Sequence, residues 1–223
     1  ILSELRKYKN VTMRSRMMGA GVYDHGYLLG YERLNDHLST NEGPRHRLWR
    51  IRAKQIITAT GAIERPLSFP GNDIPGIMLA SAVRDYATNF GVAVGDKVAI
   101  FTNNDDAYRT AITLHEIGVT VPVIIDARSG GGGELAHHAK ELGIRVENGK
   151  AISKVFGQKR VKAVTICDYE KSGANKEKIE CDSIAMSGGW SPVVHLFSHC
   201  GGKLKWDEDC LLYTSDAADE LLG

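Results

Sequence analysis

Two short motifs that end in glycine each follow an apolar segment, and both could approach a nucleotide. The first is Thr58-Ala-Thr-Gly61 and the second is Ser187-Gly-Gly-Trp-Ser-Pro192. Small residues at the carboxyl end of a buried strand let a dinucleotide lie where a longer side chain would collide. A tight turn after a core strand would explain either motif alone, but a duplicated domain explains both. We therefore predict cofactor contacts at four positions: Thr60, Gly61, Gly188 and Gly189.

A third segment, Thr102-Asn-Asn-Asp-Asp106, occupies the place of a phosphate-binding turn without having its glycines. It follows the apolar segment 97–101, where a nucleotide-binding unit would carry G-x-G-x-x-G. Carboxylates at Asp105 and Asp106 favour the N-terminal end of a helix and would repel a phosphate there. We interpret these two residues as helix caps.

Three neighbouring positions remain candidates for ligand contacts. Asn103 and Asn104 belong to the same turn and are kept as candidate cofactor-binding residues. Asp126 ends the next predicted strand, where a ribose-binding carboxylate would stand, but without the glycines this role is doubtful. The run of four glycines over 130–133 precedes no Lys-Ser or Lys-Thr, so we interpret it as a flexible connection and not as a phosphate loop.

Cysteine and histidine positions predict neither redox nor metal chemistry. No pair of cysteines has the spacing of a redox disulfide or of a metal site, so reduced thiols are favoured and disulfide reductase activity is disfavoured. His137 and His138 are adjacent and would point to different sides of a helix. We predict no catalytic residue and no metal ligand in this chain. The cysteines are Cys167, Cys181, Cys200 and Cys210.

The apolar pattern predicts an α/β protein in which a β-meander precedes a parallel βαβ unit. Each predicted helix is followed by a glycine at or near its end. The predicted strands are 10–16, 28–34, 47–52, 54–61, 97–101, 119–125, 144–146, 150–156, 161–169 and 178–184. The predicted helices are 78–90, 105–117 and 134–142.

From residue 97 on, a parallel βαβ unit comes first, a β-meander second and a strand that runs into Gly-Gly last. This order is typical of a two-domain dinucleotide-binding fold of the disulfide-reductase type, here with its first domain incomplete. Proline and glycine are dense over 67–77, which marks a crossing between domains. We assign 1–75 to the carboxyl-terminal part of the first dinucleotide-binding domain, with its meander and crossing. Residues 76–209 form a second domain of the same type.

Charge and hydropathy disfavour two classes of partner, and both ends of the chain look cut. The net charge of +1 gives no basic field for nucleic acid, and no apolar run is long enough to cross a bilayer, so a cytoplasmic protein is expected. Residues 1–7 resemble the end of an amphipathic helix. Residues 210–223 resemble a translated sequencing adapter, with an ordinary acidic helix as the alternative, and we expect them to lie outside the fold.

The chain resembles the alpha subunit of heterotetrameric sarcosine oxidase from about residue 1 to 209. These motifs are far more specific than the glycine patterns, and Thr-Asn-Asn-Asp in place of a glycine fingerprint is a feature of that family. The segments that carry the resemblance are Tyr23-Asp-His-Gly-Tyr27, the stretches 44–54, 59–66 and 76–82, Phe101-Thr-Asn-Asn-Asp105 and the stretch 187–196.

The resemblance implies an oxidoreductase subunit that acts on CH–NH bonds, in an enzyme that demethylates sarcosine to glycine and produces peroxide. It implies NAD on this subunit, FAD and FMN in the assembled complex, and beta, gamma and delta subunits as partners. Tetrahydrofolate would bind a carboxyl-terminal domain that this chain lacks, giving methylenetetrahydrofolate. The upstream glycine-rich turn for NAD is also absent, so the isolated chain is expected to be inactive.

Two alternatives remain open at this point. The first is a subunit of a related amine-oxidising flavoenzyme of the hydrogen cyanide synthase, octopine oxidase or proline dehydrogenase type. The second is a catalytically silent module, in which the second domain kept its fold as an interface after losing nucleotide binding. The acidic turn at Asp105 and Asp106 favours the silent role for that half.

Overall fold

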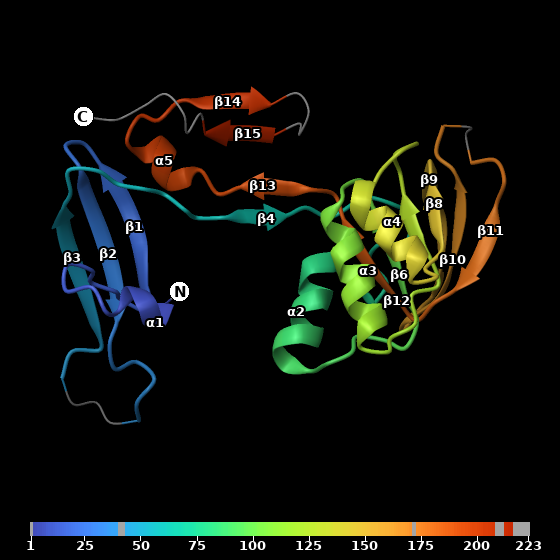
Figure 1. The fold of residues 1–223 in the computed structure, drawn as a ribbon, viewed down its shortest axis with the longest axis horizontal. Helices are drawn as coiled ribbons and strands as arrows, with labels where there is room; N and C mark the ends of the chain where they lie inside the picture. The colour runs from blue at the N-terminus through green and yellow to red at the C-terminus, as the bar shows by residue number, and fades with distance from the viewer. Residues whose placement is uncertain (1, 40–42, 171–172, 208–211, 216–223) are drawn as a thin grey trace. The chain divides into compact units, whose positions relative to one another are not determined.

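The chain forms two compact units (Figure 1). The computed structural model describes residues 2–39, 43–170, 173–207 and 212–215. One unit, here the meander unit, consists of 1–62 and 192–223. The other, here the parallel-sheet unit, consists of 63–191.

Short helices and strands alternate along the described chain in the order of an α/β protein. The helices are α1 (Leu2–Leu5), α2 (Ala80–Phe90), α3 (Asp106–Glu116), α4 (Gly133–Glu141) and α5 (His195–His199). The strands are β1 (Met17–Tyr23), β2 (Tyr27–Arg33), β3 (His46–Arg52), β4 (Ala62–Glu64), β5 (Ile77–Leu79), β6 (Val98–Thr102), β7 (Ile124–Asp126), β8 (Val146–Asn148), β9 (Lys150–Gly157), β10 (Val161–Asp168), β11 (Glu177–Glu180), β12 (Ser183–Ser187), β13 (Trp190–Pro192), β14 (Leu204–Asp207) and β15 (Leu212–Ser215).

The meander unit contains the predicted antiparallel meander, in the order β1-β2-β3. Its first strand covers 17–23, so the predicted strand over 10–16 is wrong. The reason is the register, because Tyr23 pairs with Tyr27 and Met17 with Glu32. Residues 10–16 would need partners beyond the end of β2, and a segment without partners does not form a strand.

The strand predicted over 54–61 is also wrong, although its sequence is apolar. These residues are not in a strand, and the Ile57 side chain is 92% exposed. A buried parallel strand needs neighbours on both sides to bond its N–H and C=O groups. Among the described residues no strand lies beside 54–61 to supply them.

The parallel-sheet unit is built on five parallel strands in the order β5-β12-β6-β7-β8. The predicted βαβ unit is confirmed as β6, α3 and β7. One face of the sheet packs against α2, α3 and α4, with Tyr108 and Leu114 completely buried. The other face packs against the antiparallel sheet β9-β10-β11 through residues such as Val164 and Ile166. Each fully buried aliphatic side chain of this kind contributes about 1.5–3 kcal/mol.

Several predicted boundaries in this unit differ from the structure; β7, for example, begins at Ile124 and not at 119. The single strand predicted over 178–184 is in fact β11 and β12, which belong to different sheets. The break lies at Asp182, whose carboxylate accepts hydrogen bonds from the backbone N–H groups of Asp96 (2.9 Å) and Lys97 (3.2 Å). Only Ile179 of β11 is buried, whereas β12 is buried along its whole length. Helix α2 likewise begins at Ala80, because 77–79 form β5.

Most of the carboxyl-terminal segment 210–223 lies outside the described residues. Residues 212–215 form β15, which pairs antiparallel with β14 in a two-stranded sheet separate from the parallel sheet. This pairing does not join the segment to the parallel sheet, so the interpretation of 210–223 as a translated adapter stays a prediction. In the part of the chain that the structure describes, no helix is long and apolar enough to span a membrane.

Candidate functional site at the carboxyl end of the parallel sheet

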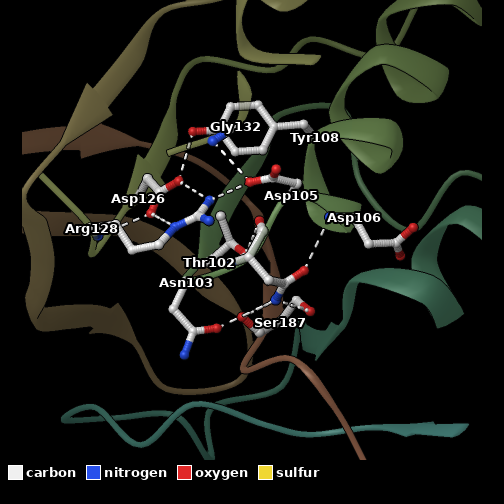
Figure 2. Close-up of polar contacts among 10 residues, drawn as sticks. Thr102, Asn103, Asp105, Asp106, Tyr108, Asp126, Arg128, Gly132 and Ser187 are labelled. Atoms are coloured by element: carbon white, nitrogen blue, oxygen red, sulfur yellow. Dashed lines mark hydrogen bonds and ion pairs between the residues drawn. The ribbon is translucent and has the colours of Figure 1, made fainter. Parts of the chain in front are cut away.

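The βα turn after β6 is closed by its own side chains (Figure 2). The Asn104 N–H donates to Thr102 Oγ1 (3.0 Å), and the Thr102 hydroxyl donates to the Asn104 carbonyl (2.9 Å). Asn104 Nδ2 donates to Ser187 Oγ (2.8 Å) and to the Ser187 carbonyl (3.2 Å), which joins the ends of β6 and β12. Asn104 Oδ1 accepts the backbone N–H of Asp106 (3.1 Å) in the first turn of α3. Asn104 is therefore fully engaged within the protein.

Neither Asp105 nor Asp106 caps α3, so the prediction of two caps is wrong. Asp105 lies at the N-cap of α3 but makes no side-chain bond to that helix, and the Asp106 carboxylate pairs with Arg84 and Arg109. Its Oδ1 accepts from Arg128 Nη2 (2.7 Å) and from the backbone N–H of Gly132 (2.9 Å). Gly132 directly precedes α4, so the carboxylate serves the N-terminal end of the next helix instead. The glycine run predicted as a flexible connection is thus anchored at Gly132.

Asp126 is the most buried acid of the site, with no exposed surface. Its Oδ2 accepts the Tyr108 hydroxyl (2.8 Å) and Arg128 Nη2 (2.7 Å). Its Oδ1 accepts the backbone N–H and Nε of Arg128, both at 3.0 Å. Figure 2 shows Arg128 between Asp126 and Asp105. A carboxylate with four donors inside the protein has no lone pair left for a ribose hydroxyl.

The protonation of this network is fixed by burial and by charge. Burial alone would raise the pKa of Asp105, but hydrogen bonds from Arg128 and the Gly132 N–H outweigh it and lower the pKa. Burial and the bond to Asp126 raise the pKa of Tyr108 far above its usual value. The bond to Asp126 raises the pKa of Arg128. Two carboxylates thus share one permanent cation, and the network carries excess negative charge where a phosphate would lie.

The N-terminal end of α2 is also occupied by an acid of the chain. Glu64, which is 5% exposed, accepts from the backbone N–H (2.8 Å) and the hydroxyl (2.6 Å) of Ser81 through Oε2. The N-cap residue of α2 is Leu79, which has no side chain able to cap. Glu64, Asn104 and Asp105 thus bond to backbone N–H groups at the starts of α2, α3 and α4. Helix N-termini are where a phosphate binds, and here the protein fills them itself.

Each of the two motifs predicted to contact a cofactor forms hydrogen bonds with a residue just beyond the other motif. In the meander unit, the Val193 N–H donates to the Gly61 carbonyl (2.9 Å), and the Thr60 hydroxyl donates to the Val193 carbonyl. In the parallel-sheet unit, the Arg65 N–H donates to the Gly189 carbonyl (2.8 Å) and the Gly188 N–H to the Arg65 carbonyl (2.7 Å). The sequence did not predict these bonds to Val193 and Arg65.

The glycines of these motifs differ in what surrounds them. Gly61 has φ of 72° and no heavy atom within 4 Å of the place of a Cβ, so its exposed backbone is open to a ligand. A Cβ on Gly188 would lie 2.7 Å from the Pro66 carbonyl oxygen, so this glycine serves backbone packing. Gly189 has φ of 92°. Gly61 therefore fits a nucleotide contact, whereas Gly188 has a structural reason of its own.

Asn103 lies at a cleft of about 590 Å³ within the parallel-sheet unit. Phe69 and Phe101 line it, with ring centroids 5.4 Å apart in an edge-to-face arrangement. Asn103 is exposed, and its Oδ1 accepts only a long bond from Asn104 Nδ2 (3.4 Å). It is therefore the member of the predicted asparagine pair that remains open to a ligand.

Three residues of the site were missed in the sequence: Glu64, Tyr108 and Arg128. Arg128 follows Asp126 by two residues in a loop, which is a weak signal for an ion pair. Tyr108 lies one turn into α3 with the apolar residues, so its position indicates a core residue. Glu64 acts on a helix 17 residues away, and no local pattern predicts such a remote cap.

No family model matches the chain. Among curated proteins, it is 38% identical to the sarcosine oxidase alpha subunit of Corynebacterium sp. (strain U-96) over 93% of this chain and 22% of that protein. It is 39% identical to the alpha subunit from Rhizobium meliloti (strain 1021) over 92% of this chain and 20% of that protein. An opine oxidase subunit of Agrobacterium tumefaciens (strain Ach5) is 23% identical over 71% of this chain and 35% of that protein.

Solved structures share the fold at lower identity. L-proline dehydrogenase from P. horikoshii has a TM-score of 0.58 and 21% identity, over 93% of this chain and 34% of that one. Thioredoxin reductase from T. acidophilum has a TM-score of 0.59 and 18% identity, over 85% of this chain and 57% of that one. These likenesses confirm the predicted disulfide-reductase-like dinucleotide-binding fold. The resemblance seen in the sequence is confirmed as well: over nearly all of its length this chain is a relative of the sarcosine oxidase alpha subunit, and it spans about a fifth of the length of those relatives.

Proposed function

We propose that this chain is part of the alpha subunit of an enzyme that oxidatively demethylates sarcosine to glycine. The observation that supports it is an identity of 38–39% to two sarcosine oxidase alpha subunits, spread over more than nine-tenths of the chain. In such an enzyme, the flavin would accept the hydride from the CH–NH bond and pass the electrons to oxygen, giving peroxide. The resemblance to the family implies FAD and FMN elsewhere in the complex and tetrahydrofolate in a further domain.

Within that enzyme, we propose that Thr60 and Gly61 bind NAD, and that the carboxyl end of the parallel sheet does not. Gly61 offers open backbone, and Thr60 is exposed. Gly189, with its left-handed backbone, and the open Asn103 remain candidate contacts of lower weight. Asn104 and Gly188 are excluded from our proposed site because their polar group or their missing Cβ is needed within the protein.

The second dinucleotide-binding domain, proposed at 76–209, would then serve as a scaffold. Its network of Asp105, Asp126 and Arg128 does not fit a pyrophosphate, because the two carboxylates accept the backbone N–H groups of Arg128 and Gly132 and would repel a phosphate. The proposed partners are the beta, gamma and delta subunits that the resemblance implies, and the proposed location is the cytoplasm. A scaffold with no dinucleotide of its own agrees with the silent interface considered from the sequence.

The test is to co-express the full-length subunit with its partner subunits and to measure peroxide production from sarcosine. NAD released on denaturation is quantified by chromatography with Gly61→Val and Asp105→Ala variants of the subunit. We expect Gly61→Val to lose most of the bound NAD and Asp105→Ala to keep it. Loss of NAD in Asp105→Ala alone would place the nucleotide at the parallel sheet and refute the assignment.

A second candidate is an oxidase for a related secondary amine. It is favoured by the 23% identity to the opine oxidase subunit over 71% of the chain. The same assembly is therefore assayed with sarcosine, octopine and L-proline under one set of conditions. A turnover with octopine or L-proline well above that with sarcosine would replace the sarcosine assignment by this one.

A further inference from the structure

The cleft beside Asn103 is built entirely from residues of the parallel-sheet unit. Its lining comes from the segment 67–70, the ends of β6, β7 and β10, and the start of β9. Its volume of about 590 Å³ lies within the usual range of small-molecule sites, about 300–1,000 Å³. The cleft therefore does not depend on how the two units are placed, and it is large enough for a small ligand.

One wall of the cleft is apolar and aromatic. Phe69 and Phe101 are 9% and 5% exposed, and their rings meet edge to face at an angle of 83°. Both belong to the core between the parallel sheet and the sheet β9-β10-β11, together with Ile152, which also lines the cleft. Packing therefore fixes this wall. Aromatic side chains bind another planar ring by stacked or edge-to-face contact, so the wall fits a flat ring.

The rim of the cleft carries polar groups that the described chain leaves without a partner. Arg128 Nε and Nη2 are held by Asp126 and Asp105, but Arg128 Nη1 has no acceptor among the described residues. Asn103 Nδ2 also has no acceptor there, and Asn103 Oδ1 accepts only the long bond of 3.4 Å. In Figure 2 the Asn103 side chain points away from the network around Arg128.

These two side chains together define a pattern of donors and acceptors. The guanidinium offers donors only, whereas the Asn103 amide offers a donor and an acceptor. Because Arg128 is already ordered by its two carboxylates, little side-chain entropy is lost when a ligand accepts from it. The matching partner is a ring whose edge carries a carbonyl or a ring nitrogen beside an N–H group.

The charges around the cleft disfavour an anion. Asp105 and Asp126 share the single cation of Arg128, and Glu170 adds a further acid to the lining. No lysine or histidine is among the described residues that line the cleft. A cationic ligand is also disfavoured, because it would lie against the apolar wall and beside the guanidinium. The chemistry of the cleft therefore selects an uncharged molecule.

We propose that this cleft binds an uncharged planar heteroaromatic molecule of nucleobase size, with its ring on Phe69 and Phe101 and its polar edge on Asn103 and Arg128. The inference goes beyond the proposed function, because it assigns a ligand to a unit whose proposed role is that of a scaffold. A phenylalanine or tyrosine from another part of the subunit could cover the wall. It would offer at most one hydroxyl to the two polar side chains.

The experiment measures binding by isothermal titration calorimetry to the full-length subunit co-expressed with its partner subunits. The probes form two pairs that differ only in charge: nicotinamide against nicotinate, and adenosine against AMP. The first variant is Asn103→Ala, and its matched control is Asn89→Ala, an exposed asparagine of α2 outside the cleft. The second variant, Ala151→Leu, narrows the cleft without changing its polar rim. Gly61→Val tests binding at the proposed NAD contact instead.

We expect nicotinamide to bind at least about tenfold more tightly than nicotinate, and adenosine at least about tenfold more tightly than AMP. Asn103→Ala and Ala151→Leu should each weaken the two uncharged probes about five- to tenfold. Asn89→Ala and Gly61→Val should stay within about twofold of the wild-type subunit. Hydrogen exchange over β6 and β9 verifies that both cleft variants are folded, and the charge pairs decide without any variant.

Nicotinate or AMP binding as tightly as its uncharged counterpart would overturn this inference. So would unchanged binding in either cleft variant, loss of binding in Gly61→Val, or no binding of nicotinamide and adenosine at millimolar concentration. The last result would show that another part of the protein fills the cleft or that its polar rim selects no ring. All of these outcomes leave the proposed function intact, because peroxide production from sarcosine and bound NAD test it separately.

Discussion

Removing the Arg128 side chain should destabilise the parallel-sheet unit far more than removing an arginine with equally short ion pairs on the surface. Arg128→Ala takes away both guanidinium donors of Asp126 (2.7 and 3.0 Å) and one donor of Asp105 (2.7 Å). Breaking a buried ion pair typically costs about 3–5 kcal/mol because a charge stays buried and unpaired. Asp126 keeps the Tyr108 hydroxyl and a backbone N–H, so we expect a loss of about 2–3 kcal/mol in the free energy of unfolding.

The matched control is Arg145→Ala. Arg145 bonds to Glu177 at 2.6 and 2.7 Å and to Glu147 at 2.7–2.8 Å, but Arg145 and Glu177 are 43% and 47% exposed. Solvent replaces such contacts, so its loss should cost less than about 1 kcal/mol. Burial of the carboxylate that each arginine binds is therefore what separates the two variants.

The assay is urea unfolding followed by far-UV circular dichroism, with hydrogen exchange of peptides from β6 and β7 to localise the effect. Asp126→Asn in the Arg128→Ala background should recover about 1 kcal/mol, because a neutral amide needs no cation. Equal losses for Arg128→Ala and Arg145→Ala, or no recovery by Asp126→Asn, would refute the assignment of a buried charge network.

Three further predictions concern pH, thiols and glycines. The folded-state pKa of Asp105 lies below its usual 3.8, because the bonds from Arg128 and the Gly132 N–H outweigh burial. The stability that this carboxylate contributes is therefore complete above pH 3.8 and is lost as the pH falls through the lower folded value. Asp105→Asn should flatten the acid unfolding of β6–β7 measured by hydrogen exchange, and an unchanged acid limb would contradict this. Burial, and then the nearby Asp182 charge, raise the pKa of Cys181 from 9.0 to about 12, so the stability that the neutral thiol contributes should be lost only as the pH rises from about 9 towards 12. Iodoacetamide at pH 8 should therefore modify the half-exposed Cys200 well before Cys181, as measured by peptide mass spectrometry. Equal labelling rates would argue against this burial. Gly188→Ala should lower the free energy of unfolding by roughly 2 kcal/mol or more in thermal unfolding, because its Cβ would meet the Pro66 carbonyl oxygen at 2.7 Å. Gly61→Ala should cost about 1 kcal/mol, for its positive φ alone. The reverse order would show that the close approach at Gly188 is not maintained.

The regular elements of the parallel-sheet unit could be predicted because their signals are local. Helices α3 and α4 each have an apolar stripe at helical spacing and a glycine near their end. The β6-α3-β7 unit follows from the alternation of strand and helix along the chain. The wrong predictions concern segments whose structure depends on pairing with neighbouring strands. Residues 54–61 contain an apolar stretch, as β6 does, but only β6 has strands on both sides.

The sequence located the turn of the candidate site but did not predict which side chains bond to one another there. The sequence indicated that the turn at 102–106 lacks the glycines of a phosphate site, and the structure agrees. It did not indicate that Arg128 joins Asp105 to Asp126, because three residues from two loops and a strand end meet only in the folded chain. The interpretation of Asp105 as the cap of α3 failed for the same reason, since its carboxylate reaches Gly132 instead.

The donors that would bind a phosphate are the same ones that a stable sheet must satisfy without it. Backbone N–H groups at the start of a helix need an acceptor, and a bound nucleotide or the protein itself can supply it. In the parallel-sheet unit, Glu64, Asn104 and Asp105 supply it, so the unit reaches its folded state with no ligand. Restoring nucleotide binding would therefore require more than adding glycines to the turn. Removing Glu64 or Asp105 would leave a backbone N–H unpaired, and removing Asp105 would also free Arg128 to pair more closely with Asp126. This dependence of stability on acceptors from the protein itself is the physical reason to propose the unit as a scaffold, whereas Gly61, whose backbone faces open space, stays our proposed nucleotide contact.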